Sequence, residues 1–262
     1  MSYSEQVPRR EQAPRRRRPP RGKRKKQHFF LNIFIVILVI AGLYLLVTSS
    51  IFDVKYFTIE NNQHFTEAQI VEISGVPKGE NIFTIRVSHA QERLEQDPYI
   101  RGARVQWDLP DTIAISLDER TEDVLVASGD DLLLLNYDGT ILRTDAAKSA
   151  LPLIVGLTPK DPAPGQPLKV AEADLLKPCF DFFQLMQLHD FPVQHLDVGN
   201  LLPRVYILDT FYIEGTLKDI ENNIDELKRV VAYQLANVSD RGKISVSATG
   251  TGSFIPENSG TV

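Results

Sequence analysis

The side chains best able to do chemistry gather in one short stretch of the sequence. His189 and Asp190 are followed a few residues later by His195 and Asp197, and imidazole and carboxylate groups are common ligands of metal ions such as zinc. A metal site would need these side chains on one helical face or in one tight loop. The intervening Phe191-Pro192-Val193 instead indicates a passage from a helix to a strand, which would separate the two histidines. We therefore expect no metal site here.

Two acidic pairs could also pass for general acid and base groups. They are Asp108 with Asp111 and Asp130 with Asp131. Each pair flanks a predicted strand, where Asp commonly serves a turn, and neither has a His or a nucleophile beside it. The sequence contains no Gly-rich phosphate loop, no Gly-x-Ser-x-Gly and no Ser-x-x-Lys. We expect no enzymatic activity, no cofactor and no small-molecule substrate.

The chain has a single cysteine, Cys179, so it can form no intramolecular disulfide and no multi-cysteine metal site. Its apolar neighbours predict a buried structural thiol. With 262 residues, of which 43% are hydrophobic and 24% charged, the chain is long enough to bury one or two cores without a disulfide.

Charge is distributed very unevenly along the chain. Residues 1–28 hold eleven Lys or Arg against two Glu, a net charge of +9, whereas the other 234 residues hold 18 basic and 32 acidic side chains, a net charge of −14. Two segments of opposite charge suggest two compartments. The basic cluster consists of Arg15, Arg16, Arg17, Arg18, Arg21, Lys23, Arg24, Lys25 and Lys26, besides Arg9 and Arg10.

Residues 29–47 are apolar and uncharged, with the sequence FFLNIFIVILVIAGLYLLV. A helix of this length spans about 28 Å, close to the hydrocarbon thickness of about 30 Å, which predicts a transmembrane helix. A cleaved signal peptide is the alternative, but its apolar region would be shorter and the following Thr48-Ser49-Ser50 offers a poor cleavage site. We expect a retained anchor.

Orientation follows from the basic cluster, because positively charged flanks stay in the cytoplasm. We expect a single-pass protein with a disordered cytoplasmic tail (residues 1–28) and its bulk (residues 50–262) outside the cell membrane. A basic run can also bind nucleic acid. This one is Pro-rich, lacks interleaved aromatic residues and adjoins the span, so attraction to membrane lipid is the expected role and no nucleic acid partner is expected.

The remaining chain divides into two predicted units, residues 51–121 and 122–256, before a short disordered tail (257–262). The first has the order β-α-α-β-β, with Thr66 and Gln69 forming a capping box and Ser88 with Gln91 capping the second helix. The second is strand-rich with mixed α and β elements. Its predicted elements are the hairpin Asp131–Tyr137 with Thr140–Leu142, extended Leu151–Ile154, helix Leu175–Leu188 with Pro178 in its first turn, strands Phe191–Val198, Arg204–Leu208 and Phe211–Glu214, helix Leu217–Leu235, and a last strand Lys243–Ala248.

Residues 24–256 carry a set of short motifs in a recognisable order. They are Ile51–Lys55, Gly79–Phe83, Asp97–Ala103, Leu109–Ile113 running on to Glu119-Arg120, then Asp138-Gly139 and Leu151-Pro152. In this order, behind a basic tail and one span, they resemble the FtsQ/DivIB family of bacterial cell-division proteins, and the first unit resembles a POTRA domain. The resemblance implies a divisome scaffold at the division septum, with FtsL-type and FtsB/DivIC-type bitopic proteins as partners.

Two positions depart from the family pattern. Asn61 stands where many relatives have Gly, and Asn tolerates the left-handed backbone conformation that such a turn requires. Ser245 stands where relatives often have an acidic residue, which puts a side-chain contact there in doubt but leaves a main-chain contact open.

The predicted last strand has little chain left to cover it. An uncovered strand presents unpaired N–H and C=O groups to a partner strand, so we expect partner binding at Lys243, Ile244, Ser245, Val246, Ser247 and Ala248. The alternative is that the strand is internal or is blunted by Lys243 and its serines.

Two other functions remain open. A POTRA-type module that handles polypeptides in secretion or envelope assembly would predict repeated units or an attached barrel, for which the sequence shows no pattern. A membrane-tethered cell-wall enzyme would lose function, while staying folded, when His189, Asp190 and His195 are replaced together.

Overall fold

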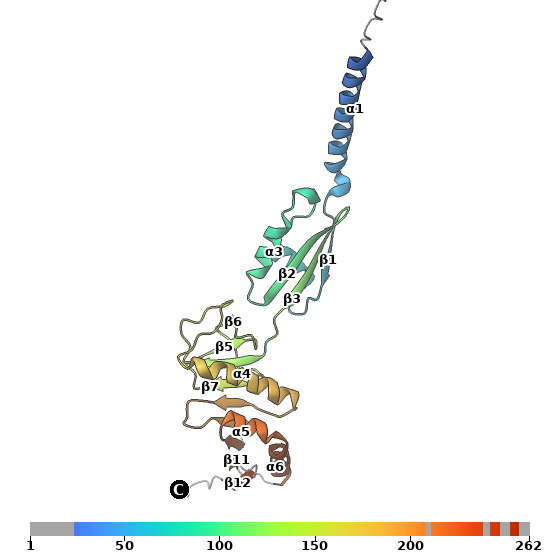
Figure 1. The fold of residues 1–262 in the computed structure, drawn as a ribbon. Coiled ribbons are helices and arrows are strands. Elements are labelled where there is room, and N and C mark those ends of the chain that lie inside the picture. Colours follow the sequence, from blue (N-terminus) through green and yellow to red (C-terminus); the bar gives the residue numbers. More distant parts are fainter. Residues whose placement is uncertain (1–23, 208–210, 238–241, 247–251, 257–262) are drawn as a thin grey trace, which may run out of the picture. The chain divides into compact units, whose positions relative to one another are not determined.

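The computed structural model describes residues 24–207, 211–237, 242–246 and 252–256 (Figure 1). The chain separates into two units, Met1–Phe52 and Asp53–Val262. The first unit is formed by helix α1 (Arg24–Val47) and a single 3-10 turn (Ser50–Phe52). In the described part of the chain, His28–Val47 is the one segment long and apolar enough to cross a membrane, with a mean hydropathy of 2.9.

The second unit begins with a three-stranded sheet covered by two helices on one side (Figure 1). The strand order is β1-β3-β2, with β1 parallel to β3 and β2 antiparallel to β3. Alternate residues of β2 and β3 are buried toward the helices, as their period of two predicts. The elements are β1 (Tyr56–Glu60), α2 (Glu67–Ser74), the 3-10 turn η2 (Ile82–Thr84), α3 (Val87–Glu95), β2 (Ile100–Asp108) and β3 (Thr112–Glu119).

The two predicted helix caps have different outcomes. Thr66 accepts a hydrogen bond from the backbone N–H of Gln69, and the Gln69 side chain accepts from the Thr66 backbone, so the capping box is confirmed. The cap predicted at Ser88 is wrong, because α3 begins at Val87 with Arg86 as its N-cap and no side-chain cap bond. Ser88 therefore lies inside the first turn, two residues after the N-cap position.

The larger sheet has nine strands among the described residues, in the order β12-β11-β10-β9-β8-β7-β4-β5-β6. The predicted strands are present, Phe211–Glu214 with the predicted bounds and several others shorter than predicted, and β4 and β12 were not predicted. The predicted strand Phe191–Val198, for example, is reduced to three residues. The strands are β4 (Val124–Ser128), β5 (Asp131–Leu135), β6 (Ile141–Arg143), β7 (Leu153–Val155), β8 (His195–Asp197), β9 (Arg204–Ile207), β10 (Phe211–Glu214), β11 (Gly242–Val246) and β12 (Gly252–Pro256).

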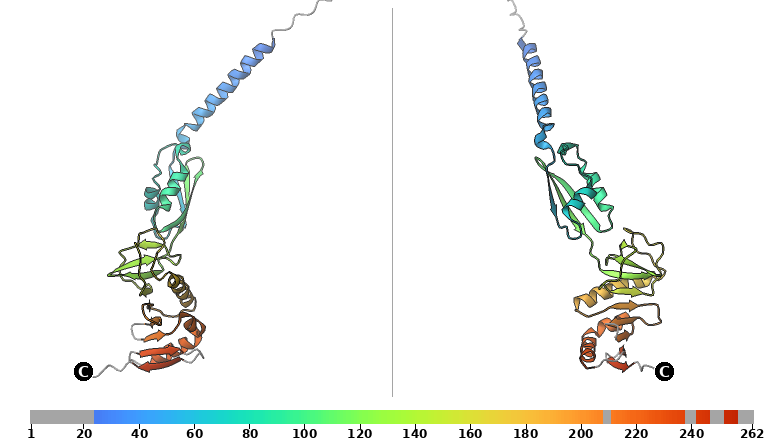
Figure 2. Two further views of the ribbon diagram at one scale, coloured as in Figure 1. Left: turned by 60° about the vertical axis from the view of Figure 1, so that its left-hand side comes forward. Right: turned by 180° about the vertical axis from the view of Figure 1, so that it is seen from behind.

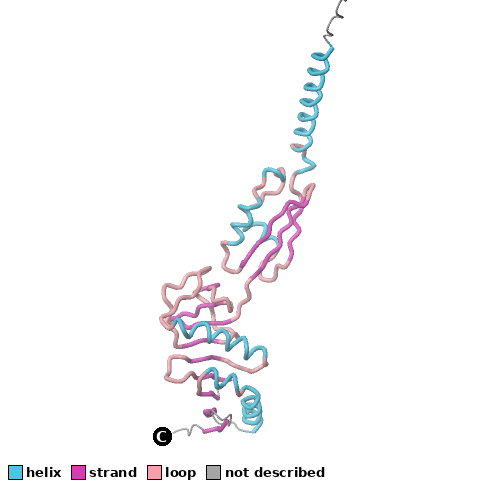
Figure 3. The backbone as a smooth tube through the Cα atoms, in the orientation of Figure 1, coloured by secondary structure: helices cyan, strands magenta, loops and turns pink. Residues whose placement is uncertain are grey.

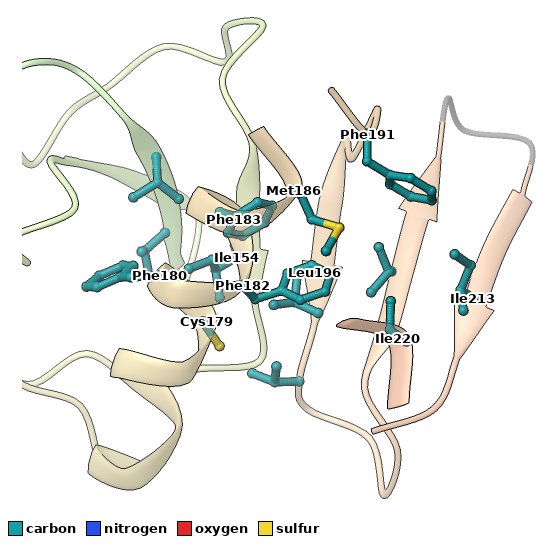
Figure 4. Close-up of a cluster of buried hydrophobic side chains, with 14 of the residues drawn as sticks. Ile154, Cys179, Phe180, Phe182, Phe183, Met186, Phe191, Leu196, Ile213 and Ile220 are labelled. Carbon is teal, nitrogen blue, oxygen red and sulfur yellow. The ribbon is translucent and has the colours of Figure 1, made fainter. Parts of the chain in front are cut away.

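One face of this sheet packs against α4 (Ala173–Leu188), α5 (Leu217–Asn222) and α6 (Ile224–Asn237), which lie on the same side in Figure 2. The core between them is continuous (Figure 4). Phe182 of α4 and Leu196 of β8 are fully buried at its centre, and Ile213 and Ile220 extend it toward the C-terminal strands. Burying each of these side chains contributes about 1.5–3 kcal/mol.

Two helix predictions need correction. The continuous helix predicted over Leu217–Leu235 is divided at Asn223, whose side-chain amide donates to the backbone carbonyl of Asp219 and whose backbone leaves the helical conformation. An Asn side chain that binds nearby backbone competes with helical bonds in this way. Pro178 lies in the second turn of α4 rather than the first, because the helix begins at Ala173.

A second, smaller hydrophobic cluster packs near the segment that connects β3 to β4. Tyr99, buried at the start of β2, packs with Leu125, Leu134 and Leu142 of the larger sheet. Its hydroxyl donates to Glu122 at 2.8 Å, and burial, followed by this bond, raises the pKa of Tyr99 well above its ordinary value. The fold class expected from the sequence, α+β with an N-terminal apolar helix and two sheet-forming segments, is confirmed.

Candidate partner-binding edge

The strand predicted to be last and uncovered, Lys243–Ala248, is neither. As β11 it pairs in parallel with β10 and antiparallel with β12, so it is an interior strand. The reason is that the chain returns through Gly252–Pro256 and adds β12 alongside it. Figure 3 shows the C-terminal strands in magenta at the bottom of the view. Within the described residues, β12 pairs with β11 alone and forms one edge of the sheet, and β6 forms the opposite edge.

Lys243 is engaged within the sheet. Its amine donates to the carboxylate of Glu214 on β10, and Arg204 Nε on β9 donates to the other oxygen of the same carboxylate at 3.3 Å. The bond from Lys243, and then that from Arg204, hold the pKa of Glu214 below its usual range. These three side chains tie β9, β10 and β11 together on the face that the helices do not cover.

The other residues of the predicted site differ in their surroundings. Ile244 is fully buried in the main core, and Ser245 lies between Glu214 and Ser253 in register. Val246 is the last residue of β11. Ser247 and Ala248 lie outside the described residues, as does the basic cluster up to Lys23, whereas Arg24, Lys25 and Lys26 open α1. That these six residues contact a partner stays a prediction.

The edge strand β12 packs against the rest of the sheet through one aromatic side chain, Phe254. Phe254 packs edge-on against Phe211 of β10, with ring centroids 5.7 Å apart. Its ring crosses directly over Gly242, where an added Cβ would come within 2.2 Å of it. Ile255, opposite Lys243, is 51% exposed. Gly242 therefore allows the close approach of β12, and this edge leaves an apolar side chain in solvent.

The His and Asp residues that could have bound a metal ion do not form one site. His189 ends α4, while His195 on β8 stacks against Tyr206 with ring centroids 3.9 Å apart. Asp197 accepts from the backbone N–H of Gly199 and from the Asn200 amide, a turn-stabilising role. Asp190 takes a positive φ of 50° directly after the helix. In the part of the chain that the structure describes, no group of three or more His, Cys, Asp or Glu could hold a metal ion.

The two acidic pairs flank turns, as expected. Asp111 accepts from Lys55 Nζ at 3.2 Å beside the β2–β3 turn, and Asp131 pairs with Ser128 where β4 turns into β5. Cys179 is confirmed as a buried thiol, and burial raises its pKa to about 12, so it stays protonated.

Comparison with known proteins adds an independent observation. Residues 52–120 match the POTRA domain, FtsQ-type. The cell division protein DivIB of Clostridium acetobutylicum is 26% identical over 204 residues, covering 76% of this chain and 81% of that protein. DivIB of Geobacillus kaustophilus is 22% identical over 71% of this chain and 69% of its own length. The cell division protein FtsQ of Syntrophotalea carbinolica is 33% identical over 31% of this chain and 29% of that protein.

The predicted resemblance to the FtsQ/DivIB family is confirmed. A solved structure, the major extracytoplasmic domain of DivIB from Geobacillus stearothermophilus, matches 47% of this chain and 99% of that chain at 13% identity, with a TM-score of 0.31. Similarity at that level carries no conclusion about this fold. The confirmation depends instead on the FtsQ-type POTRA match and on the extended DivIB alignments.

Asn61, where the family resemblance led us to expect Gly, is accommodated. Its φ of 64° is left-handed, and its side-chain amide lies 3.4 Å from the Ser116 hydroxyl as a hydrogen-bond donor. The turn survives the replacement because Asn adopts this conformation at low cost. The edge strand β12 is the feature that sequence reasoning missed; its signal was weak, an aromatic and a β-branched residue, Phe254 and Ile255, after Gly252.

Proposed function

We propose that this chain is a membrane-anchored cell-division scaffold. Its outer part holds other bitopic division proteins and helps assemble the septal complex, without performing a reaction. The names of its relatives, cell division proteins DivIB and FtsQ, support the division role. We further propose the domain organisation predicted from the sequence, with a POTRA domain over residues 51–121 and a second domain over residues 122–256.

The observation that carries the scaffold proposal is the edge strand β12. A strand with one unpaired side offers a row of N–H and C=O groups that an extended segment of another protein can bind by strand addition. β12 carries the exposed Ile255 beside that row, which can pack against an alternate side chain of the added strand. The site thus combines main-chain affinity with a small apolar contact.

The anchor proposal depends on α1 and the basic tail. One apolar helix directly follows a segment of net charge +9, which favours a cytoplasmic N-terminus and an outer C-terminal part. In this orientation β12 is accessible to other single-span division proteins in the same membrane. We propose FtsL-type and FtsB/DivIC-type proteins as these partners and the division septum as the location.

Two truncations test the role of β12. A chain ending at Pro256 keeps β12, whereas a chain ending at Val246 removes it and leaves β11, with its buried Ile244, in place. We expect the first to co-purify with the small bitopic partners from detergent-solubilised membranes and the second to lose them, because only the second lacks β12 and its exposed Ile255, and the new edge strand, β11, does not carry this side chain. Equal recovery of partners with both chains would contradict the proposal.

A fold control and a localisation measurement complete the experiment. Both truncated chains should unfold cooperatively in denaturant, since, among the described residues, the shorter one loses only the partly buried Phe254 from the core and keeps all the fully buried side chains, Phe182 and Leu196 among them. A fluorescent fusion of the full chain should gather at midcell in dividing cells, and a uniform membrane signal would argue against the division role.

A further inference from the structure

Three large apolar side chains are exposed together at one end of the POTRA domain. Phe83 of η2 is 37% exposed, Trp107 near the end of β2 is 45% exposed, and Leu109 in the β2–β3 turn is 55% exposed. The rings of Phe83 and Trp107 meet edge to face, with centroids 5.9 Å apart. We call Phe83, Trp107 and Leu109 the tip cluster.

The tip cluster extends the core face of the sheet beyond its helical cover. Ala103 and Val105 point to the same side of β2 as Trp107, and both are buried under the helices. Trp107, two residues further on, lies past that cover and is nearly half exposed. An aromatic ring exposed to solvent is unfavourable in hydrophobic free energy. An exposed apolar patch of this kind often marks a site that binds a membrane or another molecule.

The chain that leaves the membrane helix joins the domain at this same end. The backbone N–H of Val54 donates to the backbone carbonyl of Glu80 at 2.9 Å, beside η2, and that of Lys55 donates to the backbone carbonyl of Asp111 at 2.8 Å, beside the β2–β3 turn. The loops that carry Phe83 and Leu109 therefore flank the point where the domain begins.

The tether between the span and that point is short. Only residues 48–53 separate Val47, the last residue of α1, from Val54, and even a fully extended chain of that length reaches about 25 Å. Residues 50–52 form a 3-10 turn, which shortens the reach further. The headgroup region on each face of a bilayer is about 5–8 Å deep, so a tether of this length allows the tip cluster to reach it.

We propose that the tip cluster inserts into the headgroup region of the membrane that α1 spans and fixes the POTRA domain against the lipid surface. Trp is the residue best suited to this zone, because its ring is apolar and its N–H can bond to headgroups or water. The inference depends on the proposed retention of α1 as an anchor.

Charges around the tip cluster are mixed. Lys55, Lys78 and Arg86 are balanced by Glu80, Asp108 and Asp111 in the same loops and strand ends. Insertion is accordingly driven by apolar burial rather than by attraction to anionic lipid, and we expect it in zwitterionic bilayers with little dependence on salt.

Trp107 is the only tryptophan of the chain, which makes its fluorescence a direct reporter. The full chain is reconstituted into phosphatidylcholine vesicles with and without phosphatidylcholine brominated near the headgroup. We expect strong quenching of Trp107 by the brominated lipid, together with a blue-shifted emission. The matched control carries Trp107→Phe with Tyr233→Trp, which moves the tryptophan to an exposed position on α6, and should be quenched several-fold less.

Four outcomes decide the inference. Equal quenching of both chains, or none of either while they float with the vesicles, overturns the docking but leaves the anchor intact. Failure to float overturns the anchor itself. Reduced quenching after Phe83→Ser with Leu109→Ser, in a chain that still floats and unfolds cooperatively, supports insertion of the whole cluster; emission that shifts only when a division partner is added would assign the cluster to a protein instead.

Discussion

At the scale of single residues, Gly242 controls whether β12 can join the sheet. We predict that Gly242→Ala displaces β12, because the new Cβ would lie 2.2 Å from the Phe254 ring and 2.9 Å from the carbonyl oxygen of Ile255. Overpacking of this kind costs about 1–3 kcal/mol. Hydrogen exchange at residues 252–256 should speed up markedly.

Gly102→Ala is the matched control for this substitution. Gly102 also lies in a strand, but an added Cβ there meets no heavy atom within 4 Å. The control should leave exchange in β12 unchanged. If both variants exchanged at the wild-type rate, the seating of Phe254 over Gly242 would be wrong.

Glu214 gives a pH-dependent prediction. Its pKa is lowered by Lys243 and Arg204, so the carboxylate contributes stability above its unfolded pKa of about 4.3 and loses it as the pH falls through the lower folded value. Glu214→Gln should lower the free energy of unfolding by about 1 kcal/mol at pH 7, with the difference vanishing in acid.

Urea titrations at a series of pH values measure this effect. Glu226→Gln is the control, since its ion pair with Arg229 is 45% and 79% exposed at the side chains and contributes little. A loss of stability in Glu214→Gln that persists unchanged at pH 3 would contradict the electrostatic explanation.

Residue roles that depend on local sequence were predictable, and those that depend on distant contacts were not. The Thr66 cap, the buried Cys179 and the left-handed Asn61 each follow from residue type and immediate neighbours. The ion pairs of Glu214 and the constraint on Gly242 arise only when strands far apart in the sequence are placed side by side.

At the scale of elements, mutations should distinguish the capped N-terminus of α2 from the uncapped N-terminus of α3 in the POTRA domain. Thr66→Ala should lower the free energy of unfolding by about 1 kcal/mol, because it leaves the backbone N–H of Gln69 without its acceptor. Ser88→Ala should change it by less than about 0.5 kcal/mol, since Ser88 is exposed and caps nothing. If urea titrations showed the same loss of unfolding free energy in both variants, Ser88 would act as a cap after all.

The missed strand β12 and the missed break between α5 and α6 have separate physical causes. β12 follows its neighbour after a short return, and its five residues carry too weak a pattern to be separated from a tail. The break between α5 and α6 depends on a bond from Asn223 to Asp219 that periodicity does not reveal. The edge of the sheet, and with it the candidate site, therefore moved from the predicted last strand to the strand beyond it.

At the scale of the whole molecule, the sequence predicted the fold class well, because the apolar span, the POTRA motifs and the strand-rich remainder are each long signals. What it could not predict was the strand order, since a nine-stranded sheet mixes parallel and antiparallel neighbours from distant segments. The proposed function depends on that order, because the order decides which strand is left at the edge.

The most direct measurement is photocrosslinking from β12 in dividing cells whose only copy of this protein carries a photoreactive residue at position 255. We predict crosslinks from position 255 to small bitopic division proteins, and none to them from position 143 on the opposite edge strand, β6. The same partners captured equally from both positions, or no partner captured from position 255 while division proceeds normally, would contradict the account.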